Sequence, residues 1–288
     1  MSTGRAPGKV LLLGEHSVVY GHPALAAAIP RYVTVTVELA AESKLLLPGI
    51  PAPPELLQAV EALAREAGFA GSFLARVESE IPLGSGLGSS AALGVALARA
   101  FKPGCTPGEA MSLAMHLERV LHGAPSGVDP AACAYGGIID FVRGDPPRIE
   151  QVETPHALWL CVALTGLARG THTTVLPLAE RRKTDGRVDE IFEDLHELVD
   201  DGWSALTKSA LPELGRCMDR AHALLRELGV SCAELDERVA ALKAAGALGA
   251  KLTGAGGGGA AIGLARGEQH AREIALAVGG FAVQAGAA

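Results

Sequence analysis

Aromatic residues are scarce in this chain. The 288 residues include two tryptophans, three tyrosines and six phenylalanines, which together make up 4% of the sequence. Hydrophobic residues nevertheless account for 49% and charged residues for 20%, so a globular core is expected, built mainly from alanine, leucine and valine. The chain is long for one domain and of comfortable length for two.

Positive charge is also in short supply. Lysine and arginine number 25 against 32 aspartates and glutamates, which gives a formal net charge of −7. A nucleic-acid-binding protein usually carries a basic stripe, so this balance disfavours such a partner. An anionic ligand would have to be bound by local groups such as backbone N–H donors.

Cysteines are few, odd in number and free of CxxC spacing. They are Cys105, Cys133, Cys161, Cys217 and Cys232. This pattern disfavours a disulfide framework or a cysteine-based zinc site and is typical of a reducing compartment. No apolar run approaches the roughly 20 residues of a membrane-spanning helix, and the run at 10–13 is too short for the core of a signal peptide. We therefore expect a soluble cytoplasmic protein.

The hydrophobic periodicity predicts a mixture of strands and helices without a regular βαβ repeat, and hence an α+β fold. Strands are expected at 9–16, 31–39, 72–80, 136–142, 158–166, 249–253, 259–265 and 280–284. Helices are expected at 55–68, 88–101, 107–121, 130–135, 171–183, 187–208, 211–228, 232–246 and 267–278. A proline-rich loop is expected at 40–54. The polar, proline-rich segment 142–155 predicts a division into domains 1–150 and 151–288.

Two glycine-rich stretches stand out. The first, "IPLGSGLGSSAA" at 81–92, places glycine at every second position before a helical pattern. It lacks the lysine of a Walker A loop and the third glycine of a dinucleotide-binding loop. A phosphate site at a helix start and an ordinary turn with a serine N-cap both remain open. The second, residues 254–259, has five glycines in six positions between apolar segments, which favours a tight loop over a linker.

Three segments together resemble the motifs of the GHMP kinase superfamily. They are "APGKVLLLGEHSVVYGHPALAAAI" (6–29), "IPLGSGLGSSAA" (81–92) and "KLTGAGGGGAAIGL" (251–264). Within the superfamily the sequence is most similar to mevalonate kinases, as "ERVLHGAPSGVDPAACAYGGIIDF" (118–141) also indicates. The resemblance implies a two-domain fold, with an N-terminal ribosomal-protein-type α+β domain and a C-terminal ferredoxin-like domain.

The resemblance also implies roles for individual residues. Asp129 and Lys9 match the catalytic pair, and Ser90 and Glu118 match the ligands of Mg²⁺. The phosphate loop that binds ATP would comprise Gly84, Ser85, Gly86, Leu87, Gly88, Ser89 and Ser90. The substrate-side residues would be Glu15, His16, Arg169, Thr171, Gly254 and Ala255.

Each assignment has a plainer alternative. Asp129, followed by proline, could be a helix N-cap. Lys9 could be a strand-edge lysine, and Glu118 a solvated surface carboxylate. His16 could be a structural histidine. We interpret Asp145, Asp185 and Asp189 as surface charges.

The activity implied is phosphorylation of the 5-hydroxyl of mevalonate by ATP with Mg²⁺, in a homodimer. Glu15 is expected to repel the extra charge of phosphomevalonate. The alternatives are another small-molecule kinase of the superfamily and a non-catalytic ligand sensor on the same scaffold.

Overall fold

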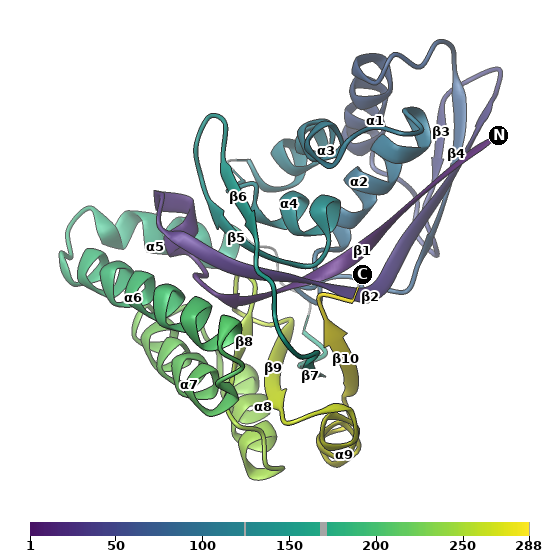
Figure 1. Ribbon diagram of the computed structural model, residues 1–288. Helices are drawn as coiled ribbons and strands as arrows, with labels where there is room; N and C mark the ends of the chain where they lie inside the picture. Colours follow the sequence, from purple (N-terminus) through teal and green to yellow (C-terminus); the bar gives the residue numbers. More distant parts are fainter. Residues whose placement is uncertain (124, 168–171, 288) are drawn as a thin grey trace. The chain divides into compact units, whose positions relative to one another are not determined.

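The chain packs as two compact units that are interleaved in sequence (Figure 1). The computed structural model describes residues 1–123, 125–167 and 172–287. Unit 1 comprises residues 1–9, 31–82 and 88–136, and unit 2 comprises residues 10–30, 83–87 and 137–288. The two long strands β1 (Ser2–Leu13) and β2 (Pro23–Leu39) contribute residues to both units. A division into sequence domains at residue 150 stays a prediction.

Unit 1 combines strands with a cluster of helices. Its elements, besides parts of β1 and β2, are β3 (Lys44–Leu46), β4 (Phe73–Ser79), α1 (Pro54–Glu66), α2 (Ser89–Phe101), α3 (Pro107–His122) and α4 (Val128–Tyr135). β4 runs antiparallel to the second half of β2 and parallel to β3. Helix α2 is buried along most of its length. It packs closely on α3 because Gly94 has no side chain: a Cβ there would lie 2.9 Å from the Cβ of Ala114.

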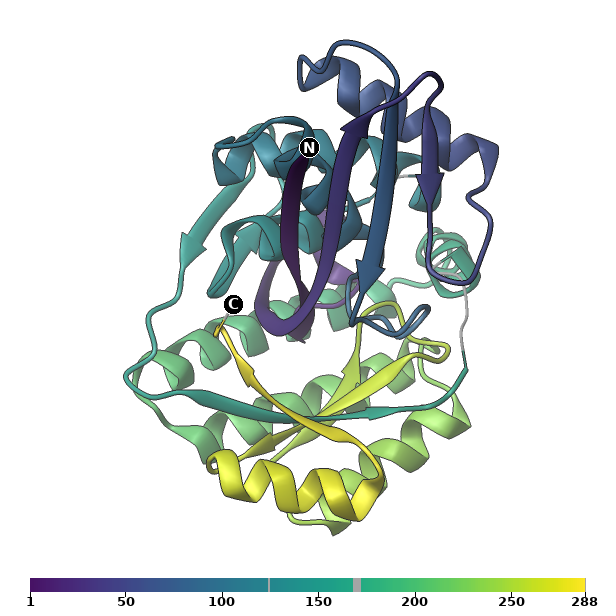
Figure 2. The same ribbon diagram turned by 90° about the vertical axis from the view of Figure 1, so that its right-hand side faces the viewer.

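Unit 2 contains an antiparallel sheet in the order β10-β7-β9-β8 (Figure 2). Its strands are β7 (Leu158–Leu164), β8 (Ala250–Thr253), β9 (Ala260–Ala265) and β10 (Phe281–Ala285). Its helices are η1 (Ser17–Tyr20), α5 (His172–Arg182), α6 (Arg187–Thr207), α7 (Leu211–Glu227), α8 (Ala233–Ala244) and α9 (Glu268–Val278). Helices α7, α8 and α9 pack on this sheet, and α6 packs on α7.

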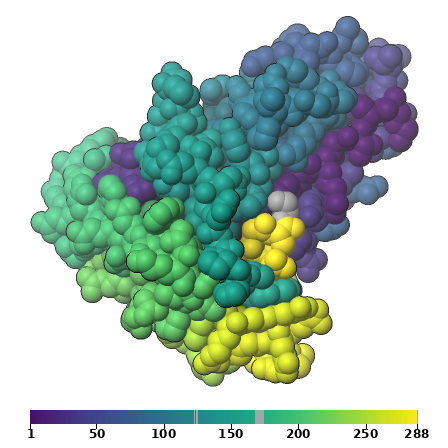
Figure 3. Space-filling view, viewed as in Figure 1, coloured from purple at the N-terminus to yellow at the C-terminus, as the bar shows by residue number. Residues whose placement is uncertain are grey.

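The first half of β2 also lies in unit 2. It pairs antiparallel with β5 (Ile138–Val142), which in turn pairs with β6 (Arg148–Gln151). Helix α6 lies at the surface, where its green side chains are seen in Figure 3. Across the described parts of the chain, no helix is both long and apolar enough to span a membrane.

Most expected helices and strands are present, and the differences have physical causes. β1 begins at Ser2 rather than 9, and β2 begins at Pro23 rather than 31. The added part of β2 is rich in alanine, a weak strand former, and it is held by pairing with β5. β3 and β6 lie inside segments expected to be irregular. Both are short strands formed through pairing with a neighbouring strand, which local composition does not reveal.

Gly4 is a position where β1 needs glycine to approach α2. A Cβ at Gly4 would lie 2.5 Å from the backbone nitrogen of Ala100 and would also collide with the carbonyl oxygen of Ala96. Backbone atoms cannot move aside as flexible side chains do. We therefore expect Gly4→Ala to lower the free energy of unfolding by about 1–3 kcal/mol, measured by denaturant titration followed by circular dichroism.

The matched control for this substitution is Gly186→Ala. Gly186 precedes α6 with a φ of −61°, and a Cβ there would meet no atom within 4 Å. Its free energy of unfolding should stay within about 0.5 kcal/mol of the wild type. Equal losses in the two variants would show that the close approach of β1 to α2 does not limit stability.

Candidate active site

Lys9 and Asp129 form an ion pair in unit 1. Lys9 Nζ lies 2.9 Å from Asp129 Oδ2, and the side chains are 1% and 32% exposed respectively. Lys9 is therefore not a solvated lysine at the edge of the sheet. A buried ammonium needs a counter-charge, and Asp129 supplies it while part of its carboxylate stays accessible to a ligand.

Asp129 is the second residue of α4, not its cap. The helix begins at Val128, and Gly127 occupies the N-cap position in a left-handed conformation with a φ of 91°. The N-cap interpretation of Asp129 is therefore wrong. At this position the carboxylate lies in the first turn of the helix, where the helix dipole stabilises negative charge.

Glu118 lies on α3, close to this pair. Glu118 is only 3% exposed, so the interpretation of Glu118 as a solvated surface carboxylate is wrong. The pKa of Glu118 is raised to about 7, mainly by burial and next by the negative charge of Asp129. A hydrogen bond from Ser90 and the positive charge of Lys9 lower it, but by less. Two carboxylates and a hydroxyl are hard oxygen donors of the kind that Mg²⁺ prefers. A divalent cation there would offset the repulsion between the carboxylates, so the donor set fits this metal.

Helix α2 begins beside Lys9. Gly88 is its N-cap, and among the described residues no side chain caps this end. The serine-cap interpretation is therefore wrong, and the first N–H groups of the helix suit an anion. Gly88 has a φ of 77°, and a Cβ there would lie 2.7 Å from Cγ of Lys9. The absence of a side chain at Gly88 leaves room for the lysine.

The alternating glycines of the loop have a common conformation. Gly84, Gly86 and Gly88 have φ values of 68°, 74° and 77°, in the left-handed region that other residues rarely adopt. Where left-handed and right-handed residues alternate, successive backbone N–H groups can turn toward one side and form a concavity that suits an anion. This conformation explains the spacing that the sequence presents.

The loop residues of unit 2 pack against the second glycine run. A Cβ on Gly86 would lie 3.1 Å from the carbonyl oxygen of Thr253, and one on Gly259 would lie 3.0 Å from that of Ser85. The two glycine-rich stretches therefore meet backbone to backbone. Thr253 anchors the second stretch, because its hydroxyl accepts from Leu11 N at 2.8 Å and donates to Leu11 O at 3.1 Å.

Glu15 and Lys251 form a second ion pair, within unit 2, and both side chains are fully buried. Lys251 Nζ also donates to the carbonyl oxygen of Leu252 at 2.7 Å. Lys251 was not among the residues predicted from the sequence, although a lysine inside an apolar strand just before a glycine run is a recognisable signal. Because Lys251 neutralises Glu15, the expected repulsion of phosphomevalonate by Glu15 loses its basis.

His16 follows Glu15 in a strained conformation. Its φ of 62° and ψ of −49° are unusual for a residue with a side chain. The ring Nε2 lies 2.9 Å from the carbonyl oxygen of Ala255, so Nε2 carries the proton and donates. Burial first, and the charge of Lys251 to a lesser extent, lower the pKa of His16 to about 4. The imidazole is therefore neutral near pH 7, with Nδ1 able to accept a hydrogen bond.

The structure thus places the predicted residues in two clusters. Unit 1 brings together Lys9, Ser90, Glu118 and Asp129. Unit 2 contains Glu15, His16, Gly254 and Ala255, together with the loop residues 84–87. Gly254 belongs to the loop contact, since a Cβ there would lie 3.2 Å from Gly86 O. Arg169 and Thr171 lie outside the described residues.

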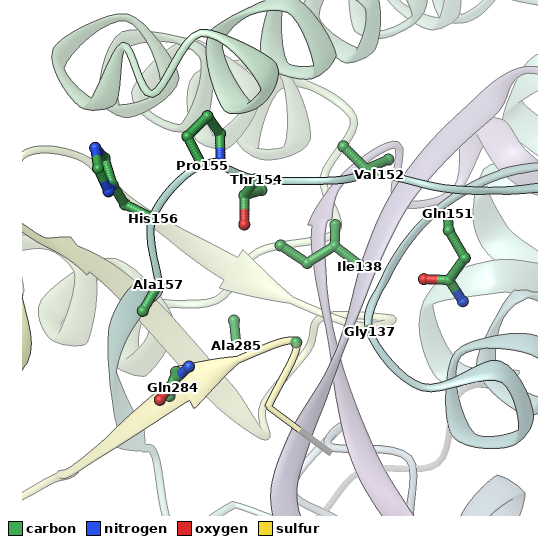
Figure 4. Close-up of a pocket in the computed structure, with 11 residues that line it drawn as sticks. Gly137, Ile138, Gln151, Val152, Thr154, Pro155, His156, Ala157, Gln284 and Ala285 are labelled. Carbon is green, nitrogen blue, oxygen red and sulfur yellow. The ribbon is translucent and has the colours of Figure 1, made fainter.

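A pocket in unit 2 contains none of these residues. It has a volume of about 270 Å³ and lies between the start of β5, the segment that follows β6 and the end of β10 (Figure 4). Its polar lining comes from Gln151, Thr154, His156 and Gln284, without an acidic side chain or a lysine or arginine. This pocket does not offer the groups that phosphoryl transfer needs.

Comparison with known proteins identifies the family of the chain. Residues 55–137 match the model of the GHMP kinases N terminal domain, and residues 204–283 match that of the GHMP kinases C terminal. The mevalonate kinase of Pyrococcus abyssi is 34% identical, over 95% of this chain and 90% of its own length. That of Methanothermobacter thermautotrophicus is 37% identical, over 91% and 89%.

A solved structure, L. major mevalonate kinase in complex with R-mevalonate, has the same fold. Its TM-score is 0.86 at 27% sequence identity, and the match covers 100% of this chain and 97% of that one. Two family models, relatives above 30% identity along nearly the whole chain and a shared two-domain fold all lead to one assignment. The chain belongs to the GHMP kinases and, among them, to the mevalonate kinase family.

Proposed function

We propose that this protein transfers the γ-phosphoryl group of ATP to the 5-hydroxyl of mevalonate. The observation that carries the proposal is the Lys9–Asp129 pair, in which a buried ammonium holds a carboxylate that is itself one-third exposed. The mevalonate kinase relatives support the choice of substrate.

ATP binding is assigned to the glycine loop and the start of α2. As a member of a kinase family the protein uses ATP. Backbone N–H groups would hold the phosphates through the concave loop and the uncapped helix end. The residues assigned to this role are Gly84, Ser85, Gly86, Leu87, Gly88, Ser89 and Ser90.

Asp129 is assigned to the proton of the substrate hydroxyl. As the hydroxyl oxygen forms a bond to the γ-phosphorus, the bond from that phosphorus to the ADP oxygen breaks, and the proton passes to the Asp129 carboxylate. Lys9, 2.9 Å away, holds the carboxylate in place and stabilises negative charge near the reacting oxygen. Positioning and charge stabilisation of this kind dominate phosphoryl transfer.

Glu118 and Ser90 are assigned to Mg²⁺. The ion would neutralise the negative charge of the ATP phosphates when bound. Glu118 is suited to this role because its buried carboxylate receives a hydrogen bond from Ser90, which fixes the two side chains relative to each other.

The substrate side is assigned to the unit 2 cluster. Neutral His16 offers Nδ1 as an acceptor for a hydroxyl, and its ring is held by the hydrogen bond that Nε2 donates to the carbonyl oxygen of Ala255. Glu15 would act through its pair with Lys251. Arg169, Thr171, Gly254 and Ala255 are assigned by resemblance. A homodimer and a cytoplasmic location stay predictions.

The choice of substrate predicts a clear preference. The described substrate-side residues offer no net positive charge for the extra phosphate of phosphomevalonate, because Glu15 neutralises Lys251 and His16 is neutral. We expect kcat/KM for mevalonate to exceed that for phosphomevalonate by at least ~100-fold, about 2.7 kcal/mol. A coupled ADP-release assay over mevalonate, phosphomevalonate, homoserine and galactose measures this.

Other outcomes of this assay would favour a different substrate or a non-catalytic role. Comparable use of phosphomevalonate, or faster use of homoserine or galactose, would replace mevalonate by that substrate. No ADP release with any of the four, in a folded protein that binds ATP, would favour the ligand sensor.

Gly88→Ala tests whether the loop and Lys9 act together. The added methyl would lie 2.7 Å from Lys9 Cγ and would push the ammonium away from Asp129. A misplacement of about 1 Å can cost ~100-fold in rate, so we expect kcat to fall by at least ~10-fold in steady-state assays.

Gly104→Ala is the matched control. Gly104 has a φ of 79°, nearly that of Gly88, but a Cβ there would meet no atom within 4 Å. Gly104→Ala introduces the same backbone strain as Gly88→Ala but no contact with Lys9. We therefore expect it to lower stability and to leave kcat unchanged. A similar kcat in both variants would show that the contact between Gly88 and Lys9 has no part in catalysis.

A further inference from the structure

We propose that His22, Glu193 and His196 bind a divalent transition-metal ion of the Zn²⁺ type, which tethers the turn before β2 to helix α6. All three residues belong to unit 2. None of them has a role in the phosphoryl transfer proposed above. The cysteines, which alone were considered for zinc in the sequence, take no part in this site.

The geometry of the three side chains suits a metal. His22 directly precedes β2, and Glu193 and His196 lie one helical turn apart on α6. One ligand atom from each residue lies within 4.8 Å of the others. Nδ1 of His22 and Nδ1 of His196 are 3.4 Å apart. Two nitrogens at about 2.0–2.1 Å from a tetrahedral zinc would be separated by roughly 3.3–3.4 Å.

The surrounding charges favour a cation. Glu193 contributes a carboxylate ligand, and Asp200 Oδ2 lies 3.9 Å from Nε2 of His196. At this distance Asp200 makes no hydrogen bond to the ring and only adds negative charge near the site. The nearby positive charge of Arg182 is paired with Asp189 at 2.6 Å.

Aromatic packing positions the ligands. The rings of Tyr20 and Phe192 stack with centroids 5.0 Å apart, and His22 lies 6.0 Å from Phe192. Tyr20 and His22 flank the turn, and Phe192 precedes Glu193 on α6. The two histidines are 174 positions apart in the chain, so a bound metal would close a long loop and stabilise the fold.

The ligand types select the metal. Two imidazoles and one carboxylate suit Zn²⁺ and its neighbours among the transition metals, whereas Mg²⁺ and Ca²⁺ prefer oxygen ligands. Glu193 is exposed and both histidines are half-buried, so a water can complete the coordination. The competing account is a hydrogen bond between two imidazoles beside a solvated glutamate.

The test is a titration of the full-length protein with Zn²⁺ in the absence of ATP, followed by calorimetry and by melting temperature. We expect one tight site per chain and a melting temperature that rises with Zn²⁺. His22→Ala and His196→Ala should weaken binding by at least ~100-fold. Co²⁺ should give the visible spectrum of a tetrahedral site with nitrogen and oxygen ligands.

The matched control is His116→Gln. His116 Nε2 lies 2.6 Å from Glu66 Oε2 in unit 1, which reproduces the histidine–carboxylate pair without a second histidine ligand. It should leave Zn²⁺ binding unchanged. The proposal is overturned if no tight site exists, or if His22→Ala and His196→Ala bind Zn²⁺ as the wild type does. A thiolate band in the Co²⁺ spectrum would also overturn it, since a cysteine would then be a ligand.

Discussion

A positive charge buried at Lys9 constrains the surroundings of the candidate active site. An ammonium removed from water is costly unless a counter-charge lies close, and loss of one partner of a buried pair typically costs about 3–5 kcal/mol. Asp129 provides that counter-charge from the first turn of α4. The requirement extends to the glycine loop, where Gly88 leaves space for the lysine side chain. Glu118 then adds a second carboxylate, whose raised pKa reflects both burial and its neighbour.

The glycine-rich stretches allow two backbone segments to approach each other closely. In unit 2 the first stretch meets the second through Gly86 and Gly259, where an added Cβ would lie only 3.0–3.1 Å from a backbone oxygen. Thr253 ties the second stretch to β1 through two hydrogen bonds to Leu11. The backbone N–H groups of the loop can then face a ligand without a Walker-type lysine in the loop itself.

Much of this arrangement could be predicted from the sequence, because it depends on local signals. Alternating apolar residues identify β4, and helical periodicity identifies α6 and α7. The candidate cluster of unit 1 was predicted from the resemblance of the glycine-rich motifs to those of the GHMP kinases, and local pattern alone favoured plainer roles for its residues. Local signals fail where a strand depends on its partner, as in the alanine-rich start of β2, or where a helix begins earlier than its proline indicates, as in α4.

Pairs that are distant in sequence could not be derived from local pattern either. Glu15 and Lys251 are 236 positions apart, and only folding shows that they neutralise each other. The same holds for His22 and His196.

The most direct test of the central claim is a double-mutant cycle on kcat with Lys9→Met, Asp129→Asn and the combined variant, each checked for folding and ATP binding. If the two residues act as one unit, each single variant loses at least ~100-fold and the combined variant loses little more. Near-normal turnover in either single variant, or losses that multiply in the combined one, would contradict the account.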